Sequence, residues 1–314
     1  MKKILFFIAI FSSQFSFSQN FKEQEIELNY NNVNLYGTLL TSPANDYLVV
    51  LIIPGSGPTD RDGNSLMIKG KNNSLKYLAE DLIAKEIPSL RIDKRGIGES
   101  ADAIVKEEDL RFEIYIDDVI NWVELLTQEY RFKKVIIIGH SEGSLIGMIV
   151  AQKTNTAGFI SIAGTGIPAD EIIKKQLETQ PDLIKEEVNR VFDKLKEGDT
   201  VGDINPMLFS IFRPSVQPYM ISWIKYNPTH EIAKLSVPSL IIQGTTDIQV
   251  SKEDADLLHK ANSKSKLILI EGMNHVFKLA PLNQEENIAT YSNPTLKNVP
   301  QLANEIIQFI NEFK

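Results

Sequence analysis

The stretch "KKVIIIGHSEGSLIGMIVAQ", residues 133–152, decides how the chain folds. Its apolar run, Val135 to Ile138, is typical of a strand that is covered on both faces. A short polar turn follows, and the second apolar segment after it has the character of a helix. The turn reads Gly139-His140-Ser141-Glu142-Gly143 and fits the pattern G-x-S-x-G, in which a serine projects from a sharp strand-to-helix turn. The sequence therefore predicts that Ser141 is a nucleophile.

The residues around this serine suit that chemistry. Flanking glycines let neighbouring backbone approach without a clash at Cβ. The start of the helix places backbone N–H groups and a partial positive charge beside a developing oxyanion. The alternative is an ordinary tight turn, in which Ser141 only caps the helix that follows.

A nucleophilic serine needs a general base, and the base needs an acid that orients it. Asp247 follows the apolar run of "LIIQGTTDIQV", and His275 follows that of "LILIEGMNHVF". Both are therefore expected in loops at the carboxyl ends of strands, where open α/β sheets assemble their sites. The order Ser141, Asp247, His275 is that of the α/β-hydrolase triad. The alternatives are a turn-stabilising aspartate and a hydrogen-bonded loop histidine.

The other histidines and two nearby aspartates are weaker candidates. We expect His140 to pack within the turn, with its ring directed away from the nucleophile. His259 is expected on a helix surface, and His230 is expected to be structural, near the start of a short helix. Asp254 and Asp256 lie early in a predicted helix and are expected to be solvated.

An acyl-transfer site also needs N–H donors for the oxyanion. Glu142, the residue after the nucleophile, can supply one through its backbone N–H. The second is expected from the loop "PGSGPTDRDGN", which follows the apolar run "YLVVLIIP". By position, the backbone N–H of Ser56 is the first choice and that of Gly57 the next. The alternative is that this loop is a plain Gly/Pro turn.

Strand-like and helical segments alternate along the chain. Two extended segments joined at Asn31-Asn32 predict an antiparallel hairpin. The later alternation predicts an α/β fold, with a mainly parallel central sheet and helices on both faces. Residues 166–234 break this rhythm, and we predict that they form a helical cap inserted into a domain that spans residues 19–314. The alternative is a set of ordinary helices packed on the sheet.

Composition excludes several classes of function. The chain has 314 residues, a formal net charge of −8 and no cysteine. The acidic balance argues against a nucleic-acid partner, which would need a basic face. Without cysteine, a thiol nucleophile and a thiolate metal site are both impossible. The predicted chemistry needs neither a metal nor a cofactor.

The first residues, "MKKILFFIAIFSSQFSFSQN", combine two lysines, an apolar run and small residues around Ser18. This order is typical of a secretory signal peptide. We expect residues 1–18 to direct export and to be removed, which gives a periplasmic or extracellular protein without stable membrane insertion. The alternatives are an uncleaved anchor and a buried first helix.

Taken together, these segments resemble the α/β-hydrolase superfamily over nearly the whole chain after the predicted signal peptide. They are most similar to bacterial esterases related to serine aminopeptidases and lysophospholipases. The stretches that carry the resemblance are "NLYGTLL", "LIIPGSGPTDRDGN", "LRIDKRGIGES", "IIIGHSEGS", "LIIQGTTDIQV" and "GMNHVF". One departure is Pro54-Gly55, which stands where many relatives have histidine-glycine.

The segment "DKRGIGES" lies outside this predicted machinery and follows a predicted strand. We expect Asp93 and Arg95 to form a structural ion pair or to brace the oxyanion loop through Asp60, Arg61 or Asp62. Neither residue is assigned a catalytic role.

The resemblance and the residues predict an exported serine carboxylesterase that cleaves small to medium acyl esters through an acyl-enzyme on Ser141. A serine aminopeptidase or a thioesterase with the same triad is the first alternative, and a non-hydrolytic ligand-binding protein on the same fold is the second. Acidic residues of the predicted cap could hold a substrate amine, although such charges more often form a solvated helix face. These residues are Asp170, Glu171, Glu178, Asp182, Glu186 and Glu187.

Overall fold

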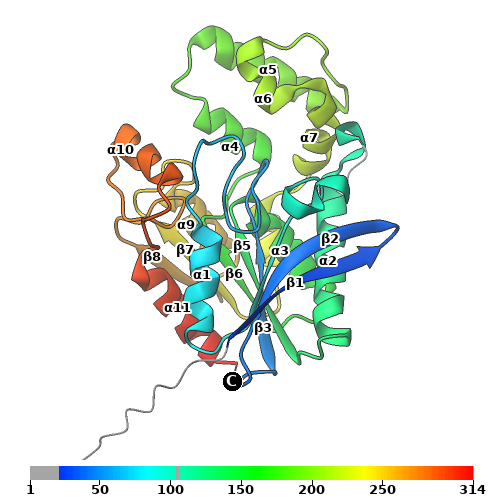
Figure 1. Ribbon diagram of the computed structural model, residues 1–314. Helices are drawn as coiled ribbons and strands as arrows, with labels where there is room; N and C mark the ends of the chain where they lie inside the picture. Colours follow the sequence, from blue (N-terminus) through cyan, green and yellow to red (C-terminus); the bar gives the residue numbers. More distant parts are fainter. Residues whose placement is uncertain (1–20, 104–105, 314) are drawn as a thin grey trace, which may run out of the picture.

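The computed structural model describes residues 21–103 and 106–313, which include an eight-stranded sheet (Figure 1). The strands are β1 (Lys22–Tyr30), β2 (Val33–Thr41), β3 (Leu48–Ile53), β4 (Ser89–Ile92), β5 (Lys134–His140), β6 (Gly158–Ile162), β7 (Ser239–Gly244) and β8 (Lys266–Ile270). Their spatial order is β1-β2-β4-β3-β5-β6-β7-β8. Pairing is parallel from β4 to β8, and β2 pairs antiparallel with both of its neighbours, β1 and β4. The predicted mainly parallel α/β fold is confirmed. The predicted signal peptide, residues 1–18, lies outside the described residues.

The hairpin predicted at Asn31-Asn32 is present. Tyr30 of β1 lies opposite Val33 of β2, so the turn has two residues. Both asparagines have positive φ, 50° and 61°, which asparagine adopts more readily than most residues. This is the geometry that two-residue hairpin turns require.

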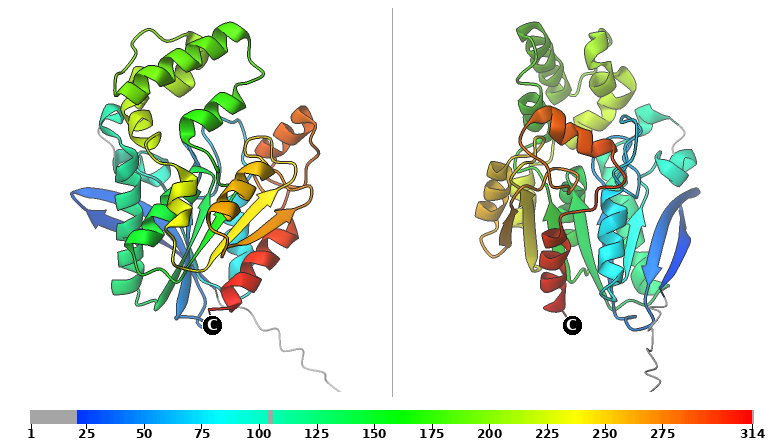
Figure 2. Two further views of the ribbon diagram at one scale, coloured as in Figure 1. Left: turned by 180° about the vertical axis from the view of Figure 1, so that it is seen from behind. Right: turned by 60° about the vertical axis from the view of Figure 1, so that its left-hand side comes forward.

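Helices cover both faces of the sheet, as predicted (Figure 1, Figure 2). On one face lie α1 (Ser74–Ile83) and α11 (Pro300–Asn311); on the other lie α2 (Phe112–Gln128), α3 (Glu142–Lys153) and α9 (Lys252–Ala261). Alternate residues of β5 supply the two apolar clusters. Ile136 and Ile138 belong to the apolar cluster that α1 and α11 cover, whereas Val135 and Ile137 belong to the cluster that α2, α3 and α9 cover. Neither α2 nor any other helix within residues 21–103 or 106–313 is long and apolar enough to cross a membrane.

Between β6 and β7 the chain forms helices that lie beyond the carboxyl ends of the strands (Figure 1). They are α4 (Ala169–Gln176), α5 (Asp182–Glu197), α6 (Phe209–Phe212) and α7 (Gln217–Trp223). The last helix of this connection, α8 (Pro228–Ala233), packs beside α3 and α9 instead. Phe192 of α5 and Phe212 of α6 are buried, with ring centroids 5.0 Å apart. Phe112 of α2 stacks on Trp223 of α7 at 6.1 Å, which anchors this segment to the sheet domain. That residues 166–234 form a separate cap unit stays a prediction.

The last connection, between β8 and α11, contains the short helix α10 (Gln284–Ala289). It packs over the loops that follow β7 and β8. The buried Asn287 of α10 donates to the carbonyl oxygen of Thr246 at 2.8 Å and accepts from Nδ2 of Asn274 at 3.1 Å. The carboxyl ends of the last two strands are therefore joined by one side chain.

Candidate active site

Ser141 stands at the sharp turn between β5 and α3. Its φ and ψ are 54° and −118°, a backbone conformation that is unfavourable for residues other than glycine. Its backbone N–H donates to the carbonyl oxygen of Ile162, at the end of β6, at 3.0 Å. The hydrogen bond to the neighbouring strand helps to hold the strained turn in place, and the serine remains partly exposed.

The glycines on either side of Ser141 are needed because backbone segments touch there. A Cβ built on Gly139 would lie 2.2 Å from the carbonyl oxygen of Gly143. A Cβ built on Gly143 would lie 2.5 Å from the carbonyl oxygen of Ile53, at the end of β3. Both approaches are impossible for a side chain, so the G-x-S-x-G spacing is a steric requirement of this turn.

The structure brings Asp247 and His275 together from the loops after β7 and β8. Nδ1 of His275 donates to Oδ2 of Asp247 at 2.8 Å, and both side chains are buried. Because an ionised carboxylate only accepts hydrogen bonds, the proton of the neutral ring lies on Nδ1. Nε2 of His275 is therefore the ring nitrogen that is free to act as a base.

Further hydrogen bonds fix the Asp247 carboxylate. Oδ1 accepts from the backbone N–H groups of Gln249 and Val250 at 2.8 and 3.0 Å, and Oδ2 accepts from Nε2 of Gln243 at 3.0 Å. Burial acts to raise the pKa of Asp247. The electrostatic attraction of His275 and the hydrogen bonds from His275, Val250 and Gln249 outweigh burial and hold that pKa below its ordinary value. Asp247 is thus kept ionised beside the histidine.

His140 packs within the turn, as predicted. Its ring centroid lies 4.8 Å from that of His275 and 4.9 Å from that of Phe277. Nε2 of His140 donates to the carbonyl oxygen of His275 at 3.0 Å, whereas Nδ1 has no hydrogen-bond partner within the described part of the chain. Burial, reinforced by the neighbouring His275, lowers the pKa of His140 to about 3, so this ring stays neutral.

The predicted oxyanion donors lie on two adjoining segments. Ser56 and Gly57 are exposed in the loop after β3, and Gly57 has a φ of 62°. Glu142 is the first residue of α3, where backbone N–H groups have no acceptor within the helix. The assignment of these three N–H groups to an oxyanion hole stays a prediction.

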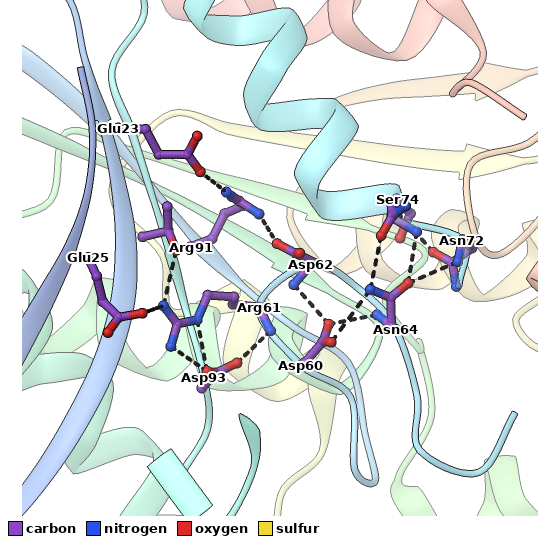
Figure 3. Close-up of polar contacts among 12 residues, drawn as sticks. Glu23, Glu25, Asp60, Arg61, Asp62, Asn64, Asn72, Ser74, Arg91 and Asp93 are labelled. Atoms are coloured by element: carbon purple, nitrogen blue, oxygen red, sulfur yellow. Dashed lines mark hydrogen bonds and ion pairs between the residues drawn. The ribbon is translucent and has the colours of Figure 1, made fainter. Parts of the chain in front are cut away.

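Charged side chains tie the loop after β3 to β4 and β1 (Figure 3). Asp93 accepts from the backbone N–H of Arg61 at 2.7 Å and from its Nε at 2.8 Å. Arg61 also pairs with Glu25 of β1 at 3.3 Å, and Asp62 pairs with Arg91 of β4. Asp93 was predicted either to pair with Arg95 or to hold the loop after β3. The structure shows the second arrangement, through Arg61.

Arg95 does not join this brace. It pairs instead with Asp118 of α2, with 3.1 Å between its Nε and Oδ2 of Asp118. Asp93 and Arg95 thus point to different parts of the domain. Lys94, which stands between them, was not predicted to take part in the site. Its Nζ donates to the carbonyl oxygen of Gly55 at 2.6 Å and to Oε1 of Glu142 at 3.1 Å.

The remaining candidates lie on the helices α8 and α9. The prediction that Asp254 is solvated is wrong, because it is 1% exposed and accepts from the backbone N–H of Gly166 at 2.9 Å. Asp256 is exposed, as predicted. His230 is exposed on α8, and His259 is partly exposed on α9, where its Nδ1 contacts a serine hydroxyl. Among the residues that the structure describes, no group of three or more acidic or histidine side chains is placed to hold a metal ion.

The sheet is largely parallel, with Ser141 at the sharp turn after β5 and with Asp247 and His275 in the loops after β7 and β8. The chain has the α/β-hydrolase fold, which the similar solved structures share. Residues 70–210 match the family described as serine aminopeptidase, S33. Esterase EstD of Thermotoga maritima is 26% identical over an alignment of 269 residues that covers 82% of this chain. The chain spans 60% of the length of that relative.

Solved structures share the fold at low sequence identity. Est1E from Butyrivibrio proteoclasticus with bound ferulic acid has a TM-score of 0.59 and 17% identity, over 90% of this chain and 98% of that one. A bromoperoxidase from Bacillus anthracis has a TM-score of 0.56 and 16% identity, over 92% of this chain and 100% of that one. At these identities the likeness concerns the fold alone.

Proposed function

We propose that the protein is a serine carboxylesterase that cleaves small to medium acyl esters through an acyl-enzyme on Ser141. The observation that carries the proposal is the buried 2.8 Å hydrogen bond from His275 to Asp247. It lies at the carboxyl ends of the parallel strands, where the strained Ser141 also stands. The similarity to an esterase over 82% of the chain supports the choice of an ester substrate.

The proposed mechanism uses groups that this chain supplies. Nε2 of His275 takes the proton from Oγ of Ser141 as the oxygen bonds to the ester carbonyl carbon. The N–H groups of Ser56 and Glu142 hold the oxyanion, and Asp247 stabilises the imidazolium. The carbon–oxygen bond to the alcohol then breaks, and the alcohol leaves with the proton from His275. Water, deprotonated by the same nitrogen, cleaves the acyl-enzyme and releases the acid.

A serine aminopeptidase is the second candidate, because the matching family has that description. It would need a free carboxylate to bind the substrate amine. Two of the acidic residues considered for this role already have cationic partners: Asp170 pairs with Lys196 at 2.5 Å, and Asp182 pairs with Lys185 at 2.8 Å. This pairing makes Asp170 and Asp182 weaker candidates for binding the amine.

The proposal is tested by pre-steady-state kinetics on a series of p-nitrophenyl esters of increasing acyl length, with the wild type and Ser141→Ala. We expect a burst of p-nitrophenol equal to the enzyme concentration, lost in the variant, and fastest turnover with short and medium acyl chains. Aminoacyl p-nitroanilides and acyl thioesters are assayed in parallel, and preference for either would select that alternative. Ester turnover by Ser141→Ala at the wild-type rate would refute the mechanism.

We also propose that residues 1–18 direct export and are removed. The order of lysines, apolar run and small residues in the sequence supports this proposal. The test is expression of the full chain in a Gram-negative host, followed by mass spectrometry of the protein in each cell fraction. We expect an exported protein that begins at Gln19. A cytoplasmic protein that retains its first 18 residues would contradict the proposal.

A further inference from the structure

Lys94 lies just after β4, and its side chain is only 3% exposed. Its Nζ contacts the carbonyl oxygen of Gly55 at 2.6 Å and Oε1 of Glu142 at 3.1 Å, and it lies 5.1 Å from the ring centroid of Tyr115. The Glu142 side chain is 2% exposed. Burying such a pair costs desolvation energy that the ionic attraction does not always recover. Stability alone is therefore a weak explanation for a lysine at this position.

Both hydrogen bonds of Lys94 reach the segments that carry the predicted oxyanion donors. The carbonyl of Gly55 and the N–H of Ser56 belong to one peptide unit, which is planar and trans. Holding the carbonyl oxygen therefore fixes the direction in which the N–H of Ser56 points. The second contact is with the side chain of Glu142, whose backbone N–H is the other predicted donor.

This peptide unit also lies beside the nucleophile. A Cβ built on Gly55 would lie 3.3 Å from Cβ of Ser141. On its other side, the carbonyl oxygen of Ser56 accepts from Oγ1 of Thr59 at 2.8 Å. Both peptide units that flank the Cα of Ser56 are thus held by hydrogen bonds to side chains, and the one next to Ser141 is held by a buried cation.

We propose that Lys94 is a positioning residue for the oxyanion hole, which orients the N–H of Ser56 and ties it to Glu142 across the nucleophile turn. The inference rests on the proposed esterase function. Lys94 acts through these two residues and makes no contact with substrate. A cation on the Gly55 carbonyl also polarises the amide, which makes the N–H of Ser56 a stronger donor to a negatively charged oxygen.

The test compares Lys94→Met with the double variant Lys94→Met/Glu142→Gln. The single variant leaves Glu142 as a buried, unpaired charge, which can destabilise the fold by itself. The double variant removes both charges, keeps the backbone N–H of residue 142, and still lacks the contact with Gly55. Lys266→Met serves as the matched control, because it breaks an ion pair with Glu312 at the amino end of β8, far from the site.

The measurements are kcat and KM for a p-nitrophenyl ester, the melting temperature, and the affinities of two inhibitors of the same shape. A trifluoromethyl ketone forms a negatively charged adduct with Ser141, whereas a neutral amide analogue does not. We expect the double variant to melt near the wild-type temperature, with kcat lowered about 10- to 100-fold, KM within about 2-fold and ketone affinity lowered by the factor seen in kcat. Affinity for the amide and the kinetics of Lys266→Met should stay unchanged.

A double variant with wild-type kcat and wild-type ketone affinity would overturn the inference. Equal losses of affinity for the ketone and the amide would also overturn it, because they would indicate general distortion of the site. In both cases the wild-type burst and its loss in Ser141→Ala would still establish the acyl-enzyme. A wild type that forms no acyl-enzyme with any ester would instead refute the proposed function, and with it the role of Lys94.

Discussion

His140 donates a hydrogen bond from Nε2 to the backbone carbonyl oxygen of His275 at 3.0 Å. His140, the residue directly before the expected nucleophile Ser141, therefore holds the backbone of His275, the expected general base. The two rings are also in contact, with centroids 4.8 Å apart. This interaction joins the turn after β5 directly to the loop after β8. In the sheet, β6 and β7 lie between these two strands.

The burial of His140 makes folding sensitive to pH. Burial and the neighbouring His275 lower its pKa from 6.5 to about 3. Below about pH 6.5 the unfolded chain binds a proton at this ring that the folded protein does not bind, so this contribution to stability is lost as pH falls toward 3. The free energy of unfolding should fall between about pH 7 and pH 5 in the wild type. We expect this fall to be smaller by about 2 kcal/mol in His140→Gln.

Urea denaturation at the two pH values measures this difference. Glutamine is chosen because its amide can still donate a hydrogen bond but does not titrate. His259→Gln, at a partly exposed position on α9, is measured in parallel as the control for the substitution itself. The same pH dependence in His140→Gln and wild type would show that the ring is protonated in the folded protein.

Replacing Asp247 by asparagine tests the orienting acid. The amide can donate where the carboxylate accepts, so it favours the wrong tautomer of His275 and loses the charge that stabilises the imidazolium. We expect kcat to fall about 10³- to 10⁴-fold, with little change in KM. Ester hydrolysis at saturating substrate measures the effect, and Asp256→Asn, at an exposed position, is the control. A kcat within about threefold of wild type would remove Asp247 from the mechanism.

The glycine after Glu142 gives a steric prediction. A Cβ on Gly143 would lie 2.5 Å from the carbonyl oxygen of Ile53 and 2.6 Å from that of Pro54, and backbone cannot move aside cheaply. We expect Gly143→Ala to lower the free energy of unfolding by about 2 kcal/mol or more and to abolish most activity by displacing the turn.

Gly202 provides the matched control for this substitution. A Cβ there would meet no heavy atom within 4 Å, so Gly202→Ala should leave stability and activity within error of wild type. Thermal unfolding and ester turnover are measured for both variants. If Gly143→Ala were as stable and active as Gly202→Ala, the close approach of β3 to the nucleophile turn would be contradicted.

The sequence was sufficient for features that neighbouring residues determine. The apolar run Val135 to Ile138, the asparagine turn and the helical spacing are local patterns, so the strands, the hairpin and the order of elements could be predicted. The burial of Asp254 could not, because it depends on the N–H of Gly166, 88 positions earlier. A charged residue early in a helix has the same local pattern whether or not another segment covers it.

The same distinction holds within the candidate site. Chain order and position after strands were enough to predict that Asp247 and His275 lie near one another, and the structure joins them by a hydrogen bond. Lys94 lies in a charged segment typical of solvated loops, and its partner Glu142 is 48 positions away. Only the packing of β4 beside β3 brings this lysine under the loop that follows β3.

Asn287 was also missed, and it gives the last prediction. It is fully buried, and its hydrogen bonds reach Thr246 and Asn274, the residues directly before Asp247 and His275. Asn287→Leu keeps the size of the side chain but leaves buried polar groups unpaired, each of which costs about 1–3 kcal/mol. We expect lower stability in urea denaturation and a kcat lowered about 10-fold, since small displacements of catalytic groups are costly.

The control for Asn287 is Asn121→Ala, which removes an exposed hydrogen bond to a backbone carbonyl on α2 and should change neither quantity. The two readouts separate two roles of Asn287. A loss of stability with a wild-type kcat would mean that the His275–Asp247 hydrogen bond alone aligns the two loops. A fall in both quantities would mean that α10 is needed to hold the acid and histidine loops in register, which gives the segment between β8 and α11 a place in the site.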